Sequence, residues 1–315
     1  MTNKKRQAYR LRNWPDYNKA LTRRGSLTLW VGADALEAWH EHERTGRRGC
    51  PRTYAAAAIL TMATLSEVYG LPLRATRGLL LSVVELLGVG LPVPCYTTLC
   101  RRRQSLEVAL PRRQKSEPLH LVVDSTGVKV YGEGEWKVRR YGWSKRRTWR
   151  KLHIGVDEAT GEVAAAAVSR NACGDGRALP LLLSQVKGEI RQVTGDGGYD
   201  DRQCYDAIRE RGARAVIPPQ QGARIWRHGN TKADSHVRDE SLRAIRRRGR
   251  AKWKRESGYH RRSLAEVAVF RLKTVFGERA SARSFPGQAR QLLVRCAALN
   301  RMTHEGMPDS YKVAA

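Results

Sequence analysis

The chain has 315 residues, of which 59 are Lys or Arg and 30 are Asp or Glu, so its formal net charge is +29. A compact fold tolerates such self-repulsion chiefly when it meets a polyanion, which makes nucleic acid the expected partner. No apolar run approaches the roughly 18 residues of a spanning helix, and no apolar segment follows the basic amino terminus. Six cysteines lack CxxC or zinc spacing. We therefore expect a soluble, cytoplasmic protein that is not exported, has reduced thiols and binds no membrane.

The amino-terminal part is expected to be helical. After a polar, Arg-rich start, three segments with helical patterns cover about 53–70, 73–87 and 96–108, with Gly/Pro turns between them. Three short helices are compatible with a helix-turn-helix DNA-binding unit and equally with any small helical bundle. The run Arg101, Arg102 and Arg103 on the third segment favours DNA. We assign residues 1–115 to a helical DNA-binding domain that ends in a linker near 111–118.

After this linker the pattern changes to that of an α/β domain, assigned to residues 116–300. Strands are expected at 119–124, 150–158, 161–169, 189–196 and 214–219, and helices at 175–186, 200–212 and 263–277. The order of three antiparallel strands followed by alternating helices and strands predicts a mixed sheet flanked by helices. RNase H-like nucleases use the same order. Residues 301–315 are assigned to a carboxy-terminal tail.

Two segments of this domain are strongly basic. Residues 136–151 read WKVRRYGWSKRRTWRK, with eight Lys or Arg, four Trp or Tyr and no acid. Residues 220–262 contain 14 Lys or Arg against 4 acids, so disorder is the default expectation and ordering against nucleic acid the alternative. Within the second segment, Trp226 and Trp253 either wedge into distorted DNA or anchor the segment to the domain. His153 either faces a metal site or is a satisfied strand histidine.

Two aspartates lie at expected strand ends, Asp124 in VVDSTG and Asp196 in TGDGGYD. Either one alone is ordinary turn chemistry. If their strands are neighbours, however, the two carboxylates meet at one edge of the sheet.

A third acid lies in YHRRSLAEVAVFRLK. Tyr259, Arg262, Glu266 and Lys273 are 3, 4 and 7 residues apart, which places them within an arc of about 60° on one helix. Leu264, Ala268, Leu272 and Val275 then face the sheet. Ser263 and Glu266 also match a capping box, in which case the helix starts at Ser263 and the first two signature residues precede it. The residues alone leave both interpretations open.

This Y-(2)-R-(3)-E-(6)-K spacing resembles the signature around the last acid of DDE transposases of bacterial insertion sequences. VVDSTG and TGDGGYD are similar to the segments that carry the first and second aspartates of that family. The segments RNWPDYNKALTRRGSLTLW and GEGEWKVRRYGWSKRRTWRKLHIGVDE look like its insertion-sequence-five branch. The similarity covers nearly the whole chain.

The resemblance implies an RNase H-like catalytic domain in which Asp124, Asp196 and Glu266 bind two Mg²⁺ ions, with Mn²⁺ as a substitute. It implies a DNA transposase that binds the terminal inverted repeats of its element, cleaves there by hydrolysis and joins the 3′-hydroxyl ends to target DNA, as a homodimer or larger assembly. Arg262 and Lys273 become phosphate clamps and Tyr259 a positioning contact. The other expected DNA contacts, on the basic stretch beside the sheet, are Lys137, Arg139, Arg140, Trp143, Lys145, Arg146 and Arg147. The alternatives are a nuclease or resolvase without strand transfer and an inactive end-binding protein.

Overall fold

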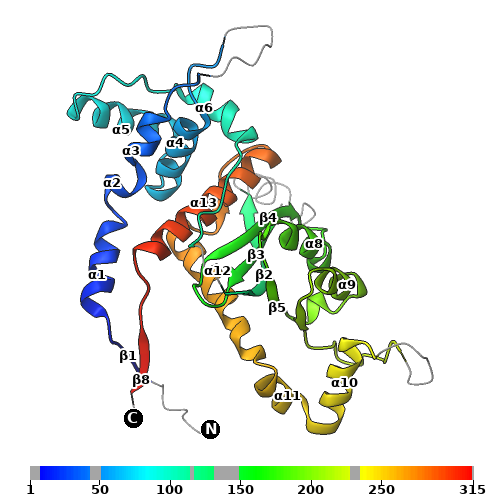
Figure 1. Cartoon of the computed structure of the whole chain (residues 1–315). Coiled ribbons are helices and arrows are strands. Elements are labelled where there is room, and N and C mark those ends of the chain that lie inside the picture. Colours follow the sequence, from blue (N-terminus) through cyan, green and yellow to red (C-terminus); the bar gives the residue numbers. More distant parts are fainter. Residues whose placement is uncertain (1–7, 43–50, 114–116, 131–148, 228–234, 314–315) are drawn as a thin grey trace, which may run out of the picture. The chain divides into compact units, whose positions relative to one another are not determined.

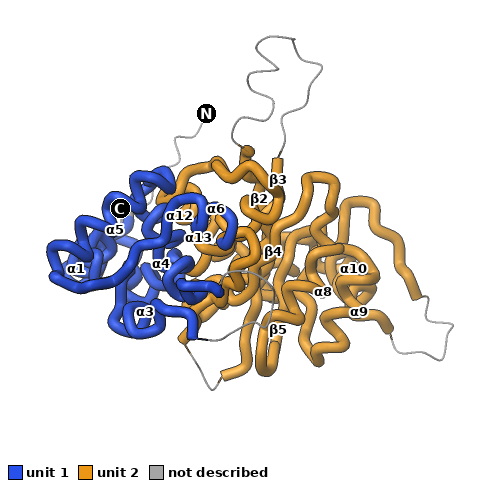
Figure 2. Tube along the Cα trace, turned by 90° about the horizontal axis from the view of Figure 1, so that it is seen from above, with its two compact units in different colours: residues 1–102, 298–315 blue, residues 103–297 orange. Residues whose placement is uncertain are grey.

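The computed structural model describes residues 8–42, 51–113, 117–130, 149–227 and 235–313 (Figure 1). Two compact units make up the chain (Figure 2). Unit 1 contains residues 1–102 and 298–315, and unit 2 contains residues 103–297. Unit 1 thus ends before the linker expected near 111–118, and it includes the segment that the sequence assigned to a tail.

Unit 1 is mainly helical. Its helices are α1 (Trp14–Arg23), α2 (Leu27–Trp30), α3 (Ala33–Glu37), α4 (Ala56–Val68), α5 (Leu73–Leu86) and α6 (Tyr96–Arg102), and α13 (Phe285–Glu305) enters it from unit 2. The chain ends pair as an antiparallel ribbon of β1 (Ala8–Leu11) and β8 (Ser310–Val313). The three helices expected from the sequence are confirmed as α4, α5 and α6.

The core of unit 1 forms around α4, whose Ile59, Met62 and Leu65 are fully buried. Trp30 and Trp39 are also buried, and the Trp39 indole donates a hydrogen bond to the Pro92 carbonyl over 2.8 Å. Among the described residues no single helix has the length and apolarity to cross a membrane. Only α4 and α5 together meet both criteria, and they are bent by 111° at the break between them.

Unit 2 is built on the mixed sheet that the sequence predicts. Its strands are β2 (Leu119–Val130), β3 (Trp149–Asp157), β4 (Val163–Arg170), β5 (Ile190–Thr194), β6 (Arg214–Val216) and β7 (Arg279–Ala280). The order is β4-β3-β2-β5-β6, and β7 pairs with the far end of β2. β2, β3 and β4 run antiparallel, whereas β5 and β6 pair parallel to β2.

Helices flank this sheet (Figure 1). α8 (Asp175–Gln185) and α9 (Arg202–Glu210) bury Leu179, Leu182 and Ile208 against strand residues such as Leu121 and Val123. α12 (Ser263–Phe276) packs on β2 and β3.

The buried side of α12 differs from the expected one. Ala265, Ala268 and Leu272 are buried, whereas Val275 is 42% exposed. The inward stripe thus includes Ala265, which the sequence did not predict, and leaves out Val275.

The described part of the basic insertion is ordered, so the default expectation of disorder was wrong there. It forms α10 (Val237–Arg248), α11 (Arg250–Glu256) and a 3-10 turn (Tyr259–Arg262). Trp226 anchors it: the Arg238 guanidinium carbon lies 3.9 Å from its ring centroid, and the Tyr205 and His236 rings pack edge-on. Trp253 is buried and packs on Tyr259. Both tryptophans therefore anchor the insertion.

Candidate active site

The two aspartates come from neighbouring parallel strands, as expected. Asp124 lies inside β2 rather than at its end, because β2 continues to pair with β3 as far as Lys129 and with β7 beyond. Asp196 follows the end of β5, which pairs with β2 at Val122. Its carboxylate accepts a hydrogen bond of 2.8 Å from the Gly198 amide and caps a 3-10 turn at Gly197–Tyr199.

The third acid is placed by the start of α12. The helix begins at Ser263, as the capping-box interpretation expected, and Tyr259 and Arg262 lie in the preceding 3-10 turn. The capping box itself is not formed, because no side chain caps α12. Glu266 instead accepts a hydrogen bond of 2.7 Å from Nη1 of Arg262. The turn runs directly into the helix and so keeps this pair together.

Arg262 connects all three acids. Its Nη2 atom lies 3.9 Å from Oδ1 of Asp124 and 3.8 Å from Oδ2 of Asp196, in addition to the short bond to Glu266. The carboxylates thus converge from β2, from the turn after β5 and from α12 on one guanidinium. Within the described residues, no three His, Cys, Asp or Glu side chains are arranged to hold a metal ion directly. A cation, the guanidinium, lies among the three acids instead.

The charges of this cluster perturb its titration. Burial raises the pKa of Asp124 above its usual value, although the Ser125 amide and Arg262 oppose the shift. Burial alone would lower the pKa of Arg262, but Tyr259 and the three carboxylates raise it. Asp124 is the most enclosed of the acids, with 15% of its side chain exposed against 39% for Asp196 and 54% for Glu266. The acids therefore face solvent on one side, where a charged ligand can enter.

Of the two remaining signature residues, Tyr259 lies beside Arg262 and Lys273 does not contact the acids among the described residues. The Tyr259 ring packs 6.1 Å from Trp253, and its hydroxyl hydrogen-bonds to Arg262. Lys273 lies further along α12, near Glu278. The pKa of Glu278 is lowered mainly by a hydrogen bond from Lys129 and then by the positive charges of nearby residues, including Lys273. The structure thus brings Tyr259 and Arg262 to the acids, and no contact between Lys273 and the acids is found among the described residues.

The other expected DNA contacts are placed differently. Arg101 is exposed at the end of α6, but the Arg102 guanidinium donates to the Tyr54 carbonyl and so has a structural contact. Arg103 begins a short 3-10 turn and is half-buried. The expected hairpin contacts lie outside the described residues: Lys137, Arg139, Arg140, Trp143, Lys145, Arg146 and Arg147.

A fourth carboxylate, which the sequence did not predict, lies beside the three acids. Asp175 begins α8, and its Oδ1 atom lies 2.8 Å from Nζ of Lys151. Burial alone would raise the pKa of Asp175, but hydrogen bonds from Lys151 and Ser125 lower it. A Cβ placed on Gly198 would lie 2.9 Å from Oδ1 of Asp196 and 3.7 Å from Oδ2 of Asp175. The signal in the sequence was the Gly-Asp pair that opens this helix.

His153 belongs to the same network. Its side chain is fully buried, and Nε2 lies 2.8 Å from the Ser169 hydroxyl. Its Nδ1 atom faces Asp175 at 3.5 Å. Burial lowers the pKa of His153, which keeps the ring neutral near pH 7. His153 is therefore a buried strand histidine that is satisfied only at Nε2, because its Nδ1 atom has no hydrogen-bond partner among the described residues.

Comparison with known proteins identifies the class. A family model described as "Transposase DDE domain" matches residues 115–301, more than half of the chain. A second model with the same description matches residues 22–133. A solved structure entitled "Cryo-EM structure of piggyBac transposase synaptic complex with hairpin DNA" is 10% identical, covers 90% of this chain and 76% of that chain, and has a TM-score of 0.39.

A mixed sheet that presents clustered carboxylates, in a chain matched over most of its length by transposase models, defines an enzyme that cleaves and transposes nucleic acid. The chain belongs to the DDE transposase family and is a DNA transposase. Its assignment to the insertion-sequence-five branch stays a prediction.

Proposed function

We propose that Asp124, Asp196 and Glu266 are the catalytic acids of this transposase and the ligands of two Mg²⁺ ions, for which Mn²⁺ substitutes. The single observation that supports this is their convergence on one guanidinium from three separate elements. Carboxylate oxygens are the ligands that Mg²⁺ prefers, with phosphate oxygens of the substrate completing its shell. When bound, the two ions supply activation of the attacking oxygen and stabilisation of the leaving oxygen.

The protein's own groups then position the DNA. Arg262 would bind a phosphate beside the cut, because ions held by the three acids would supply the positive charge that its guanidinium now supplies among them, and a guanidinium forms paired hydrogen bonds with phosphate oxygens. Tyr259 holds the turn that carries Arg262, through their hydrogen bond and its packing on Trp253. Water is the first nucleophile and frees a 3′-hydroxyl at the element's end. That hydroxyl then attacks a phosphodiester of the target DNA at the same site.

The domain types, the DNA contacts and the assembly follow from the resemblance to DDE transposases. We propose an RNase H-like catalytic domain for the sheet of unit 2 and a helix-turn-helix-like DNA-binding unit formed by α4, α5 and α6 in unit 1, where Arg101 is exposed. The amino-terminal helices recognise the terminal inverted repeats, and Lys273 adds a phosphate contact. Two element ends joined in one complex require at least a homodimer. The protein acts in the cytoplasm, on DNA.

The direct test is cleavage of a labelled duplex that carries the terminal sequence of the DNA element encoding this chain. With Mg²⁺ or Mn²⁺ the full chain is expected to nick the duplex at the element's end, and with EDTA it is expected to bind without nicking. Nicking in EDTA, or binding without nicking when divalent ions and paired ends are supplied, would contradict the proposed function.

Arg262→Met tests whether the guanidinium and a divalent ion compete for the same acids. Without ions or DNA, the variant leaves the three carboxylates without their shared cation. Because the acids are partly exposed and screened, we expect a loss of about 1 kcal/mol, or about 2–4 °C in the thermal unfolding midpoint. Adding Mg²⁺ is expected to raise the midpoint of the variant more than that of the wild type.

Arg261→Met is the matched control for that experiment. Arg261 lies in the same turn but pairs with Glu158 at 2.8 Å instead of with the three acids. Its loss is expected to leave the response to Mg²⁺ at the wild-type value. Equal responses in wild type, Arg262→Met and Arg261→Met would refute competition at this site.

A further inference from the structure

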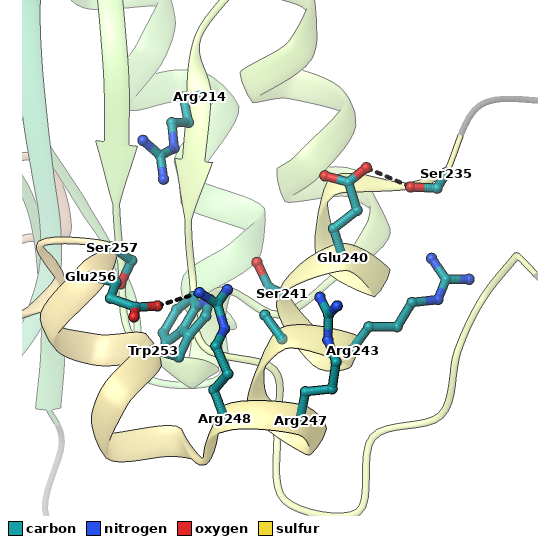
Figure 3. Close-up of a pocket in the computed structure, with 11 residues that line it drawn as sticks. Arg214, Ser235, Glu240, Ser241, Arg243, Arg247, Arg248, Trp253, Glu256 and Ser257 are labelled. Carbon is teal, nitrogen blue, oxygen red and sulfur yellow. Dashed lines mark hydrogen bonds and ion pairs between the residues drawn. The ribbon is translucent and has the colours of Figure 1, made fainter.

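A groove of about 700 Å³ lies on the basic insertion, and none of the three acids lines it (Figure 3). Its walls come from β6, α10 and α11, all within unit 2. Four arginines line it: Arg214, Arg243, Arg247 and Arg248. Two glutamates, Glu240 and Glu256, lie on its rim, and the buried Trp253 closes its floor. The groove is therefore open, polar and net positive.

The acidic side chains of the groove already have partners. Glu256 pairs with Arg248 at 2.7 Å and with Lys252 at 4.0 Å. Glu240 accepts a hydrogen bond of 2.6 Å from the Ser235 hydroxyl. The pair with Glu256 holds Arg248 in place, and the four arginines of the groove outnumber its two glutamates. The positive charge of the groove is thus available to a ligand.

The side chains of two of the arginines have no ion pair or hydrogen bond to any residue that the structure describes. Arg214 is exposed on β6 and extends toward the groove, and Arg247 is exposed on the last turn of α10 and approaches from the opposite wall (Figure 3). Arg243 donates one hydrogen bond to the Arg227 carbonyl over 3.2 Å. Guanidinium groups that point into one groove from separate elements match the spaced oxygens of a polyanion, which single surface arginines do not.

The groove is joined to the active site through one aromatic contact. Trp253 on its floor packs on Tyr259, and both belong to a small buried cluster with Val216 and Ala244. Tyr259 in turn hydrogen-bonds to Arg262, which reaches the three acids. The same short segment therefore shapes the groove on one side and the catalytic cluster on the other.

We propose that this arginine groove binds the sugar–phosphate backbone of DNA next to the point of cleavage. The inference rests on the proposed function for the identity of the polyanion, and it adds a binding surface outside the three-acid signature. Arg214 and Arg247 contact phosphate oxygens directly. Arg248, held by Glu256, supplies fixed positive charge. The binding is expected to be independent of base sequence, because contacts to phosphate oxygens carry no sequence information.

The test measures the affinity of the full chain for a 40-base-pair duplex of mixed sequence, over a range of salt concentrations. Each phosphate contact contributes about 0.9 to the slope of log K against log salt. The double variant Arg214→Gln/Arg247→Gln is expected to reduce that slope by about 1.8 and the affinity by about tenfold or more at moderate salt. Arg214→Lys/Arg247→Lys is expected to keep most of the slope.

The matched control removes two arginines from other faces of unit 2, as Arg191→Gln/Arg209→Gln. Arg191 is exposed on β5, and Arg209 is exposed on α9, where it pairs with Asp206. The control is expected to keep the wild-type slope, and circular dichroism checks that every variant is folded. Equal losses of affinity and salt slope in the two double variants would contradict DNA binding by the groove and leave the catalytic proposal intact. A wild type that does not bind the duplex would instead contradict the proposed function itself.

Discussion

Glu266→Gln is expected to abolish cleavage of end DNA while binding of that DNA is retained. The amide still accepts the hydrogen bond from Arg262 that Glu266 now accepts over 2.7 Å, so the start of α12 keeps its geometry. What is lost is one negative charge among the three acids, and with it one anionic ligand for the divalent ions. We expect the rate of cleavage to fall by about a thousandfold or more, equivalent to about 4 kcal/mol in the activation barrier.

The control for this variant is Glu278→Gln. Glu278 lies just beyond α12 and pairs with Lys129 on the surface at 3.1 Å, so its loss removes the same charge without touching the cluster. Cleavage of a labelled end by this control is expected to proceed at nearly the wild-type rate. Normal cleavage by Glu266→Gln would show that Glu266 serves only to hold Arg262.

Arg238→Met is expected to produce the largest loss of stability of any single change considered. Arg238 forms an ion pair with Asp200 at 2.6 Å, and the two side chains are 5% and 1% exposed. It also lies 3.6 Å from Asp239, which is fully buried and accepts hydrogen bonds from the amides of Trp226 and Arg227. Removing the cation leaves two carboxylates in the interior, at a cost of about 3–5 kcal/mol.

Urea unfolding measures this loss, and Arg209→Met supplies the comparison. The Arg209–Asp206 pair joins side chains that are 68% and 42% exposed, and exposed pairs contribute at most about 1 kcal/mol. A small, equal loss in both variants would mean that Arg238 does not anchor the insertion.

The sequence was most informative where local patterns act alone. Periodicity predicted the β3–β4 hairpin, α8 and α12, because alternating or helical burial leaves a direct trace in the order of residues. The parallel pairing of β2 with β5 followed from the order of elements. The approach of Asp124 and Asp196 to one cluster could therefore be anticipated. The continuation of β2 beyond Asp124 was not, because it depends on pairing with β3 as far as Lys129 and with the distant β7 at Lys129 and Val130.

The features that were missed depend on tertiary contacts. Ser263 and Glu266 satisfy a capping pattern, but Glu266 is drawn to Arg262, whose charge is shared with two acids from other strands. Charge content predicted disorder for the insertion. The described part of it is instead fixed by the buried Arg238–Asp200 ion pair and by Trp226, which packs against Arg238 and against two aromatic rings. Asp175 acts through Lys151 and Ser125, and no spacing in the chain indicates these partners.

The measurement that tests the account most directly is strand transfer by the wild-type chain. A labelled duplex with an exposed 3′-hydroxyl at the element's end is incubated with a supercoiled plasmid and Mg²⁺. If one cluster of acids performs both hydrolysis and joining, the label is expected to become covalently attached to the plasmid, and Glu266→Gln is expected to lose this product together with cleavage. Cleavage of the end without any joined product, with paired ends supplied, would contradict the account and assign the cluster to a nuclease that cuts but does not join.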